Sequence, residues 1–191
     1  DDVGIRTLTL TAVTKNDFSE ENTKITSAES MRVKDMWLRS GDILIERANT
    51  LDYVGLAALY EGPNDYAIFP DLMVRVRVDE EKILPKVMAD YLVTDSCRSY
   101  FRLNAKGTAG NFPKIDQGII SALNVPLPPI EEQKIIENAS RRFDQKIVLH
   151  RQFLKILQEL FHTLLHQLMT AQLRVNEVDL SELKAIGIVV D

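Results

Sequence analysis

Cysteine is almost absent from this 191-residue sequence, which contains only Cys97. A single cysteine excludes an internal disulfide framework, and we expect it to be a small buried hydrophobic side chain rather than a reactive thiol. Long apolar runs are absent too: no stretch of about 18 apolar residues is free of charges, so no membrane span is expected. Residues 1–4 show neither the basic nor the apolar segment of a secretory signal. Together, these absences indicate a protein of the reducing cytoplasm.

Sequence motifs for nucleotide, cofactor and methyl-transfer chemistry are also missing. The chain has no GxxxxGK loop and no GxGxxG turn, and residues 127–130 read Leu-Pro-Pro-Ile rather than Asn/Asp-Pro-Pro-aromatic. One metal-dependent alternative is a nuclease that uses Asp71, Glu80 and Lys82. Its carboxylates must converge on one Mg²⁺, yet a strand predicted at 72–78 holds them roughly 25 Å apart. We therefore expect no catalytic residues, no cofactor and no bound metal.

Acidic residues outnumber basic residues in the chain as a whole. The formal net charge is −5, and residues 1–128 hold 15 Lys or Arg against 19 Asp or Glu. DNA-binding domains are usually basic, so this total disfavours a nucleic-acid partner. The distribution of charge matters more than its sum. The segment from Ser96 to Ile115 contains no acid and four bases, which are Arg98, Arg102, Lys106 and Lys114. Any electropositive surface should therefore be local.

Predicted strands and helices are mixed over residues 1–128 without a βαβ rhythm, which places this segment in the α+β class. Alternating or β-branched runs predict strands at 4–13, 43–45, 52–60, 72–78 and 124–127. Helical patterns and proline at the first helical position predict helices at 85–94, from 95 or 96 to 103, and at 115–123. Residues 14–30 and 104–114 are expected to be loops.

The pattern changes after Pro129, because residues 130–172 contain neither glycine nor proline. Apolar residues recur there every seven positions, in two neighbouring rows that we call the seam: Phe143, His150, Leu157 and Leu164 in one row, and Ile147, Leu154, Phe161 and Leu168 in the other. This heptad pattern predicts a coiled-coil-forming helix of roughly 60 Å that needs a partner helix. The alternative is an amphipathic helix that folds back on its own domain.

His150 lies on this seam. No second His or Cys lies at ligand spacing beside it, so we interpret it as a polar, register-setting residue rather than a metal ligand. The sequence thus divides into a globular segment, 1–128, a long helix, 129–172, and a C-terminal tail, 173–191.

Four segments, taken in order, carry a resemblance to a known family. They are Gly41–Asn49 followed by Val54-Gly55, Phe69–Val76, Lys106–Asn111, and Val125–Ile136, which leads into the long helix. Their order and spacing, over about residues 41–170, resemble the specificity subunit of type I restriction-modification enzymes. Residues 1–40 match no part of that pattern. Glu46 also departs from it, because the family often has serine there, and it places a carboxylate beside Arg47.

The resemblance implies a function in DNA recognition without catalysis. A full-length member has two target-recognition domains and two helices that pair antiparallel, and each domain reads half of a split DNA sequence. This chain holds one domain and one helix, so it resembles a half-subunit or a fragment. The implied partners are double-stranded DNA, adenine-methyltransferase and restriction subunits, and a second specificity half-subunit bound through the helix as a homodimer. Residues Glu131–Gln133 are implied to contact the methyltransferase, although acids at a helix start need no such role.

Two segments are candidates for DNA contact. Arg47 and Asn49 follow a buried strand, and their side chains suit guanine and adenine respectively; alternatively, Arg47 pairs with Glu46 or Asp52. The second segment is a loop that suits phosphate contact through charge, short polar arms and freely approachable backbone, and its candidates are Lys106, Gly107, Thr108, Gly110, Asn111 and Lys114. The alternative for this loop is an ordinary turn.

Arg75 and Arg77 alternate on one strand and are expected to form a solvated face. A different function also stays open: a dimeric coiled-coil adaptor without a DNA or catalytic role.

Overall fold

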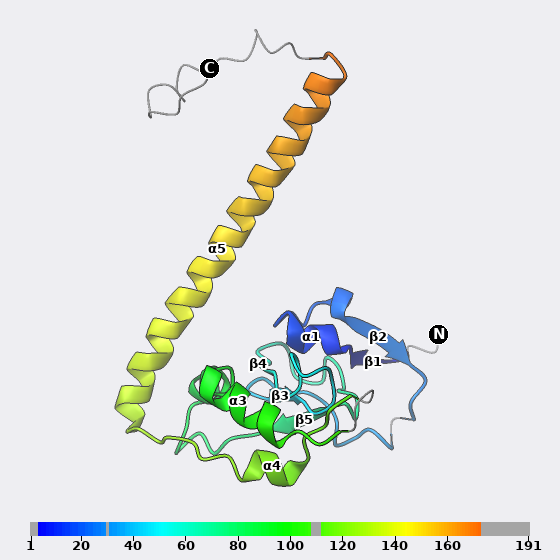
Figure 1. Ribbon diagram of the computed structural model, residues 1–191. Coiled ribbons are helices and arrows are strands. Elements are labelled where there is room, and N and C mark those ends of the chain that lie inside the picture. The colour runs from blue at the N-terminus through cyan, green and yellow to red at the C-terminus, as the bar shows by residue number, and fades with distance from the viewer. Residues whose placement is uncertain (1–3, 30, 108–111, 173–191) are drawn as a thin grey trace. The chain divides into compact units, whose positions relative to one another are not determined.

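The computed structural model describes residues 4–29, 31–107 and 112–172. The chain divides into two compact units, Asp1–Ser140 and Arg141–Asp191 (Figure 1). The division falls inside the last helix, α5, which spans Ile130–Met169. The first unit therefore includes the opening turns of α5, whereas the sequence division placed a boundary at residue 128.

A three-stranded antiparallel sheet is the centre of the first unit. Its middle strand is β3 (Ile43–Glu46), and its order is β4 (Ala57–Leu59), β3, β5 (Met73–Val76). Every residue of β3 is buried, because both faces of the sheet are covered. This explains why the strand reads as the continuous run Ile-Leu-Ile rather than as an apolar–polar alternation.

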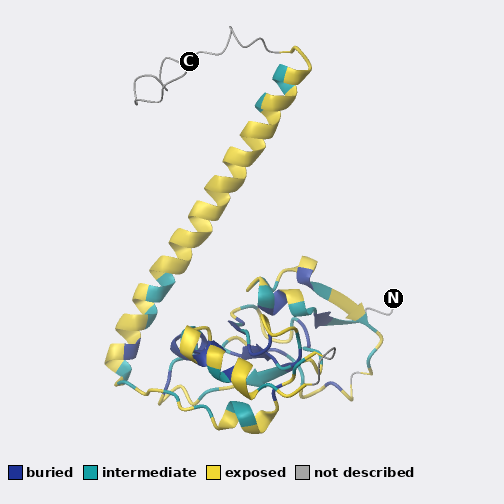
Figure 2. Ribbon diagram, viewed as in Figure 1, coloured by how far each residue is buried: buried dark blue, intermediate teal, exposed yellow. Residues whose placement is uncertain are grey.

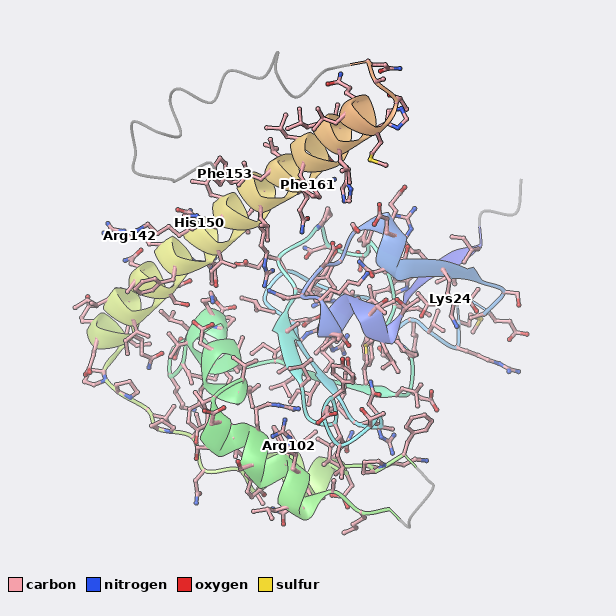
Figure 3. All side chains as sticks on the ribbon, turned by 45° about the horizontal axis from the view of Figure 1, so that its top comes forward. Lys24, Arg102, Arg142, His150, Phe153 and Phe161 are labelled. Carbon is pink, nitrogen blue, oxygen red and sulfur yellow. The ribbon has the colours of Figure 1, made fainter. Side chains whose placement is uncertain are left out.

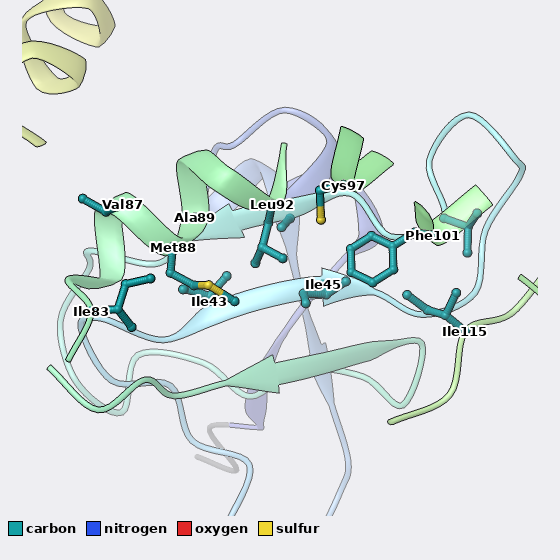
Figure 4. Close-up of a cluster of buried hydrophobic side chains, with 12 residues drawn as sticks. Ile43, Ile45, Ile83, Val87, Met88, Ala89, Leu92, Cys97, Phe101 and Ile115 are labelled. Carbon is teal, nitrogen blue, oxygen red and sulfur yellow. The ribbon is translucent and has the colours of Figure 1, made fainter. Parts of the chain in front are cut away.

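One face of this sheet packs against two helices. Ile43 and Ile45 point toward α2 (Pro85–Leu92) and α3 (Asp95–Asn104) and contact a cluster that includes Leu92, Cys97 and Phe101 (Figure 4). Burial raises the pKa of the Cys97 thiol to about 11, so the thiol stays neutral. Cys97 therefore has the buried, unreactive environment that the sequence indicated.

The other face packs against the N-terminal segment. Successive side chains of a strand point to opposite faces of the sheet, so Leu44 faces away from Ile43 and Ile45. It belongs to a second cluster with Leu8, Val13 and Tyr60. Leu8 ends β1 (Ile5–Leu8), which pairs antiparallel with β2 (Thr23–Thr26). Val13 lies on α1 (Leu10–Thr14), and η1, a 3₁₀ turn at Glu20–Asn22, leads into β2.

Helix starts follow the local rules of capping. Pro85 opens α2. The Thr94 hydroxyl accepts from the Cys97 N–H and caps α3, whereas the sequence suggested Asp95 or Ser96 for this capping position. Asp116 caps α4 (Gln117–Ser121) by accepting from the Ile119 N–H at 2.9 Å. The α+β class with a long C-terminal helix is confirmed by this mixture of elements.

Several predicted elements are wrong in detail. The strand predicted at 4–13 ends at Leu8, and α1 begins at Leu10. Its β-branched residues favour a strand, but burial of Ala12 and Val13 on one helical face determines the local structure. Within the predicted loop 14–30 lies β2, and residues 124–127 form no strand. The predicted strand at 52–60 is mostly a turn, with only Ala57–Leu59 in the sheet.

Helix α5 has 40 residues, so it is about 60 Å long at ~1.5 Å per residue. Most of its surface from Arg141 onward is exposed (Figure 2). Of the seam residues, Leu164 and Leu168 are partly buried, and the exposed ones are Phe143, Ile147, His150, Leu154, Leu157 and Phe161. A second exposed apolar row lies next to the seam and contains Leu149, Phe153, Ile156 and Leu160. No helix among the described residues is both long and apolar enough to cross a membrane.

Candidate nucleic-acid interface

The segment that leaves β3 brings the two predicted DNA-contact regions together. The backbone oxygen of Arg47 accepts from the Ile115 N–H at 2.8 Å, Ala48 bridges to Lys114, and the Asn49 N–H donates to the Pro113 oxygen at 3.4 Å. Lys114 therefore lies beside the residues that follow β3, although the two segments are far apart in sequence. Adjacent backbone segments of this kind hold side chains at fixed spacing.

Lys106 and Lys114 close the base of the loop between them. Each backbone N–H donates to the other residue's carbonyl, at 2.8 and 2.9 Å. Gly107 lies inside this closure, where a Cβ would approach the Pro113 Cα to 3.0 Å. The missing side chain of Gly107 therefore allows close packing against Pro113 of the same chain. Thr108, Gly110 and Asn111 lie outside the described residues.

The two lysine side chains reach solvent. Lys114 is exposed, and Lys106 is exposed while pairing with Asp116 at 3.2 Å. The pKa of the Asp116 carboxyl lies below its usual value, because it accepts from the Ile119 N–H and, to a smaller degree, from Lys106. Asp116 therefore joins the cap of α4 to the base of the loop and leaves the Lys106 amine near the surface.

Arg47 and Asn49 differ in how far the protein itself uses their side chains. The Asn49 amide donates to the Glu46 carboxylate, and its oxygen accepts from the Thr50 N–H at 2.8 Å. Among the described residues, the Arg47 side chain makes one long hydrogen bond, to the Asp71 carbonyl at 3.4 Å. Within the described ranges, Arg47 forms no ion pair with Glu46 or Asp52. Arg47 is consequently more available to a ligand than Asn49.

Glu46 points into the protein rather than toward Arg47. The side chain is fully buried, at 0% exposure, and its carboxylate accepts from the Thr14 hydroxyl at 2.8 Å as well as from Asn49. Burial raises the pKa of Glu46, against the opposing effects of the Asn49 and Thr14 hydrogen bonds and the Arg98 charge. The carboxylate that departs from the family pattern is therefore an internal anchor for the segment after β3.

The acid-free segment contains one structural arginine and one exposed one. The buried Arg98 guanidinium donates to the carbonyls of Val54 and Asp52, at 2.7 Å each. Burial lowers the pKa of Arg98, and the charge of Arg102 lowers it further. Arg102 is exposed on α3 (Figure 3) and donates to the Leu51 carbonyl at 3.3 Å. Sequence counting alone cannot make this distinction, because it depends on which carbonyls lie within reach.

The expectation of a solvated face at Arg75 and Arg77 is wrong for Arg75, whose side chain is 18% exposed, whereas the Arg77 side chain is 42% exposed. The Arg75 guanidinium donates to the carbonyls of Trp37 at 3.0 Å and Asp35 at 2.9 Å, and it stacks on Phe69. Arg77 binds Asp42 with two hydrogen bonds, of 2.5 and 3.1 Å. Both arginines thus hold the segment before β3 against β5.

The geometry therefore gathers a set of four cations around the loop base and the exit of β3. We call this set the cationic ridge: Arg47, Arg102, Lys106 and Lys114. Backbone pairing joins Lys114 to Lys106 and to Ala48, the neighbour of Arg47, and the Arg102 side chain donates to the Leu51 carbonyl on the segment that follows. Among the described residues, no group of three or more His, Cys, Asp or Glu side chains is arranged to hold a metal ion.

Comparison with known proteins gives a consistent picture. The family described as "Type I restriction modification DNA specificity domain" matches residues 9–183. The chain is 28% identical over 160 residues to the MjaX type I restriction enzyme specificity subunit of Methanocaldococcus jannaschii, which covers 82% of this chain and 37% of that protein. It is 26% identical over 136 residues to the type I restriction enzyme StySPI specificity subunit of Salmonella potsdam, covering 70% of this chain and 28% of that protein.

A solved structure shares the fold. One chain from a structural study of complex assembly in a type I R-M system superposes with a TM-score of 0.61 at 19% identity, covering 93% of this chain and 46% of that chain. The present chain thus spans less than half the length of the proteins it matches. Since the family match extends over most of its length, the chain belongs to the family of type I restriction modification DNA specificity domains.

Proposed function

We propose that this chain reads one half of a split DNA sequence as the specificity component of a type I restriction-modification system. The observation that carries the proposal is the cationic ridge, where four basic residues lie on three segments that hydrogen bonds hold next to one another. Family membership and the relatives' names as specificity subunits support it. The chain itself is non-catalytic in this proposal, and methylation and cleavage belong to partner subunits.

The ridge has the chemistry of a phosphate-binding surface. Lys106 and Lys114 present exposed amines from paired backbone positions, and the half-buried Arg47 adds a planar guanidinium. Cations of this kind supply sequence-independent affinity by displacing counterions from DNA, while base contacts add specificity. A net charge of −5 is no obstacle to this, because the bases are gathered at one place.

The long helix supplies the second part of the proposal. Its exposed seam suits pairing with the helix of a second copy, which would present two recognition domains to a two-fold DNA site. Adenine-methyltransferase and restriction subunits complete the assembly, as the resemblance implies. The cytoplasm, where the DNA substrate lies, is the proposed location.

The test is binding to mixed-sequence duplex DNA between about 50 and 200 mM salt. A DNA reader loses affinity steeply over this range. Lys106→Ala and Lys114→Ala should each weaken binding to all sequences and reduce the salt slope by about 0.9 for every phosphate that the variant no longer neutralises. Lys24→Ala is the matched control, since Lys24 is an exposed lysine on β2, outside the ridge (Figure 3).

Two outcomes would contradict the proposal. No DNA binding at either salt concentration, together with intact self-association, would favour the dimeric adaptor. Unchanged affinity in both ridge variants would remove the loop base from the DNA site. Co-purification of the chain with its genomic neighbours tests the partners, because a bound adenine methyltransferase is the expected result.

A further inference from the structure

A large apolar side chain stands exposed within the loop that Lys106 and Lys114 close. Phe112 is 64% exposed, although it lies only two residues from Lys114 and next to Pro113. Full burial of a phenylalanine side chain stabilises a fold by about 1.5–3 kcal/mol. Most of this stabilisation is absent at Phe112. Single exposed apolar residues are common on protein surfaces, so exposure alone assigns no role to Phe112, and its surroundings decide the matter.

The backbone that follows Phe112 is held in place by the rest of the first unit. Pro113 is half-buried against Gly107, and its carbonyl accepts from the Asn49 N–H at 3.4 Å. Ile115 is fully buried in the core beneath the sheet. Exposure thus alternates from Phe112 to Ile115, as in an extended strand. Phe112 and Lys114 consequently project on the same side, away from the protein.

Charge indicates which partner would cover this ring. Lys106 and Lys114 flank it across the closed loop base, and Arg47 adjoins them through Ile115. Another exposed apolar side chain, Leu51 at 56% exposure, lies on the neighbouring segment beside Arg102. Apolar side chains with cations beside them match a polyanion that also offers flat apolar groups. Double-stranded DNA has both, in its phosphates and its stacked bases.

We infer that Phe112 is an apolar wedge that enters the DNA and unstacks a base step while Lys106 and Lys114 bind the flanking phosphates. This inference rests on the proposed function and adds a base-contacting residue to it. Proteins that insert phenylalanine or leucine between base steps gain contacts with the deformed duplex in return for reduced stacking. Phe112 would then contribute to affinity without displacing counterions, in contrast to the lysines beside it.

The experiment begins with selection of duplexes that bind the full chain, purified with any subunits that accompany it, from a randomised pool. Adenines of the enriched duplex are then replaced one at a time by the fluorescent base 2-aminopurine. Unstacking at one step should raise fluorescence at one or two positions when the wild-type chain binds. Phe112→Ala should abolish that rise and weaken binding by about tenfold, within the range for removal of a base–aromatic stacking interaction.

The salt slope separates the wedge from its neighbours. Phe112→Ala should leave the slope unchanged, whereas Lys114→Ala should lower it by about 0.9 for every phosphate left without its cation. Phe112→Trp should retain binding and the fluorescence rise. Ile25→Ala is the matched control, because Ile25 is 62% exposed on β2 and lies outside the ridge. Thermal melting of each variant verifies that it folds.

The outcomes distinguish the two proposals. Two results would overturn the wedge and leave DNA recognition standing, provided that duplexes are enriched. One is an unchanged affinity of Phe112→Ala for the enriched duplex, and the other is the absence of a fluorescence rise with the wild-type chain. No enrichment at all would overturn both proposals. Enrichment, a local fluorescence rise and its disappearance in Phe112→Ala at constant salt slope would establish the wedge.

Discussion

Gln133 on the first turns of α5 accepts a hydrogen bond from the backbone N–H of Leu84, at 2.9 Å, through its side-chain oxygen. The amide nitrogen of Gln133 donates to the carbonyls of Lys82 and Pro128, at 2.8 Å each. The side chain has 0% exposure, so water cannot replace these partners. One glutamine therefore joins the start of α2, the loop before it and the entry to α5 within the first unit.

Gln133→Leu should destabilise the first unit, because it leaves the Leu84 N–H and two carbonyls without a partner in a buried place. Unsatisfied buried groups cost about 1–3 kcal/mol each, and partial relaxation should limit the total to about 3 kcal/mol. Urea unfolding followed by circular dichroism measures the free energy of unfolding. Gln145→Leu, at an exposed position on the same helix, should change it by less than about 0.5 kcal/mol. Equal effects of the two substitutions would contradict the anchor role.

Gly55 is a second position where the fold depends on one residue. Its φ is +73°, and an added Cβ would lie 2.5 Å from the Phe101 Cβ. Gly55→Ala should therefore combine a left-handed backbone penalty of about 1–2 kcal/mol with overpacking of about 1–3 kcal/mol. Gly41→Ala separates the two effects, because Gly41 has φ +92° but its nearest neighbour would be 3.8 Å away. If both variants were destabilised equally in urea unfolding, the contact with Phe101 would be irrelevant.

Much of the architecture follows from local patterns in the sequence. Pro85 marks a helix start, the Ile43–Ile45 run marks a doubly covered strand, and the absence of glycine and proline after Pro129 marks the long helix. Each depends on a single chain segment, so composition and period are sufficient. The segment 10–14 is different, because its helix depends on burial against β3 and β4, which no local pattern reveals.

The candidate site was only partly predictable for the same reason. The sequence placed Arg47, Lys106 and Lys114 on loops, and the structure brings them together through backbone pairing. No sequence pattern indicates that Arg98 binds two carbonyls or that Glu46 turns inward, since both depend on distant partners. Phe112 stood in a segment expected to be a loop, and no sequence pattern marks it, because the alternation from Phe112 to Ile115 is one of exposure and not of polarity.

Glu46 should make stability depend on pH. Its pKa in the folded protein is raised above the ordinary 4.5, with burial as the main cause. The folded state therefore binds the Glu46 proton more tightly than the unfolded state does. The contribution of this group is fully present below pH 4.5 and is lost as the pH rises through the folded pKa. Unfolding free energy then falls with rising pH in that window.

Glu46→Gln removes this titration. The melting temperature of the variant minus that of the wild type should increase from pH 4.5 toward neutral pH, whatever constant offset the altered hydrogen bonds to Thr14 and Asn49 introduce. Thermal melts at a series of pH values measure this difference. Glu21→Gln, at an exposed position, is the control for the loss of a carboxylate elsewhere in the first unit. A flat difference for Glu46→Gln would mean that burial does not disfavour its charge.

The seam of α5 gives the last prediction. Leu157 and Leu164 lie one heptad apart, so Leu157→Asp combined with Leu164→Asp would place two carboxylates in any interface built on that row. Desolvating a carboxylate without a partner is strongly unfavourable, and the double variant should be monomeric in light scattering over a range of concentrations. Gln145→Asp with Gln152→Asp has the same spacing on the opposite side of the helix, and it should remain dimeric. If the seam variant also stays dimeric while Phe153→Asp with Leu160→Asp dissociates, the helices pair through the neighbouring apolar row, because that row alone would then be buried between the copies.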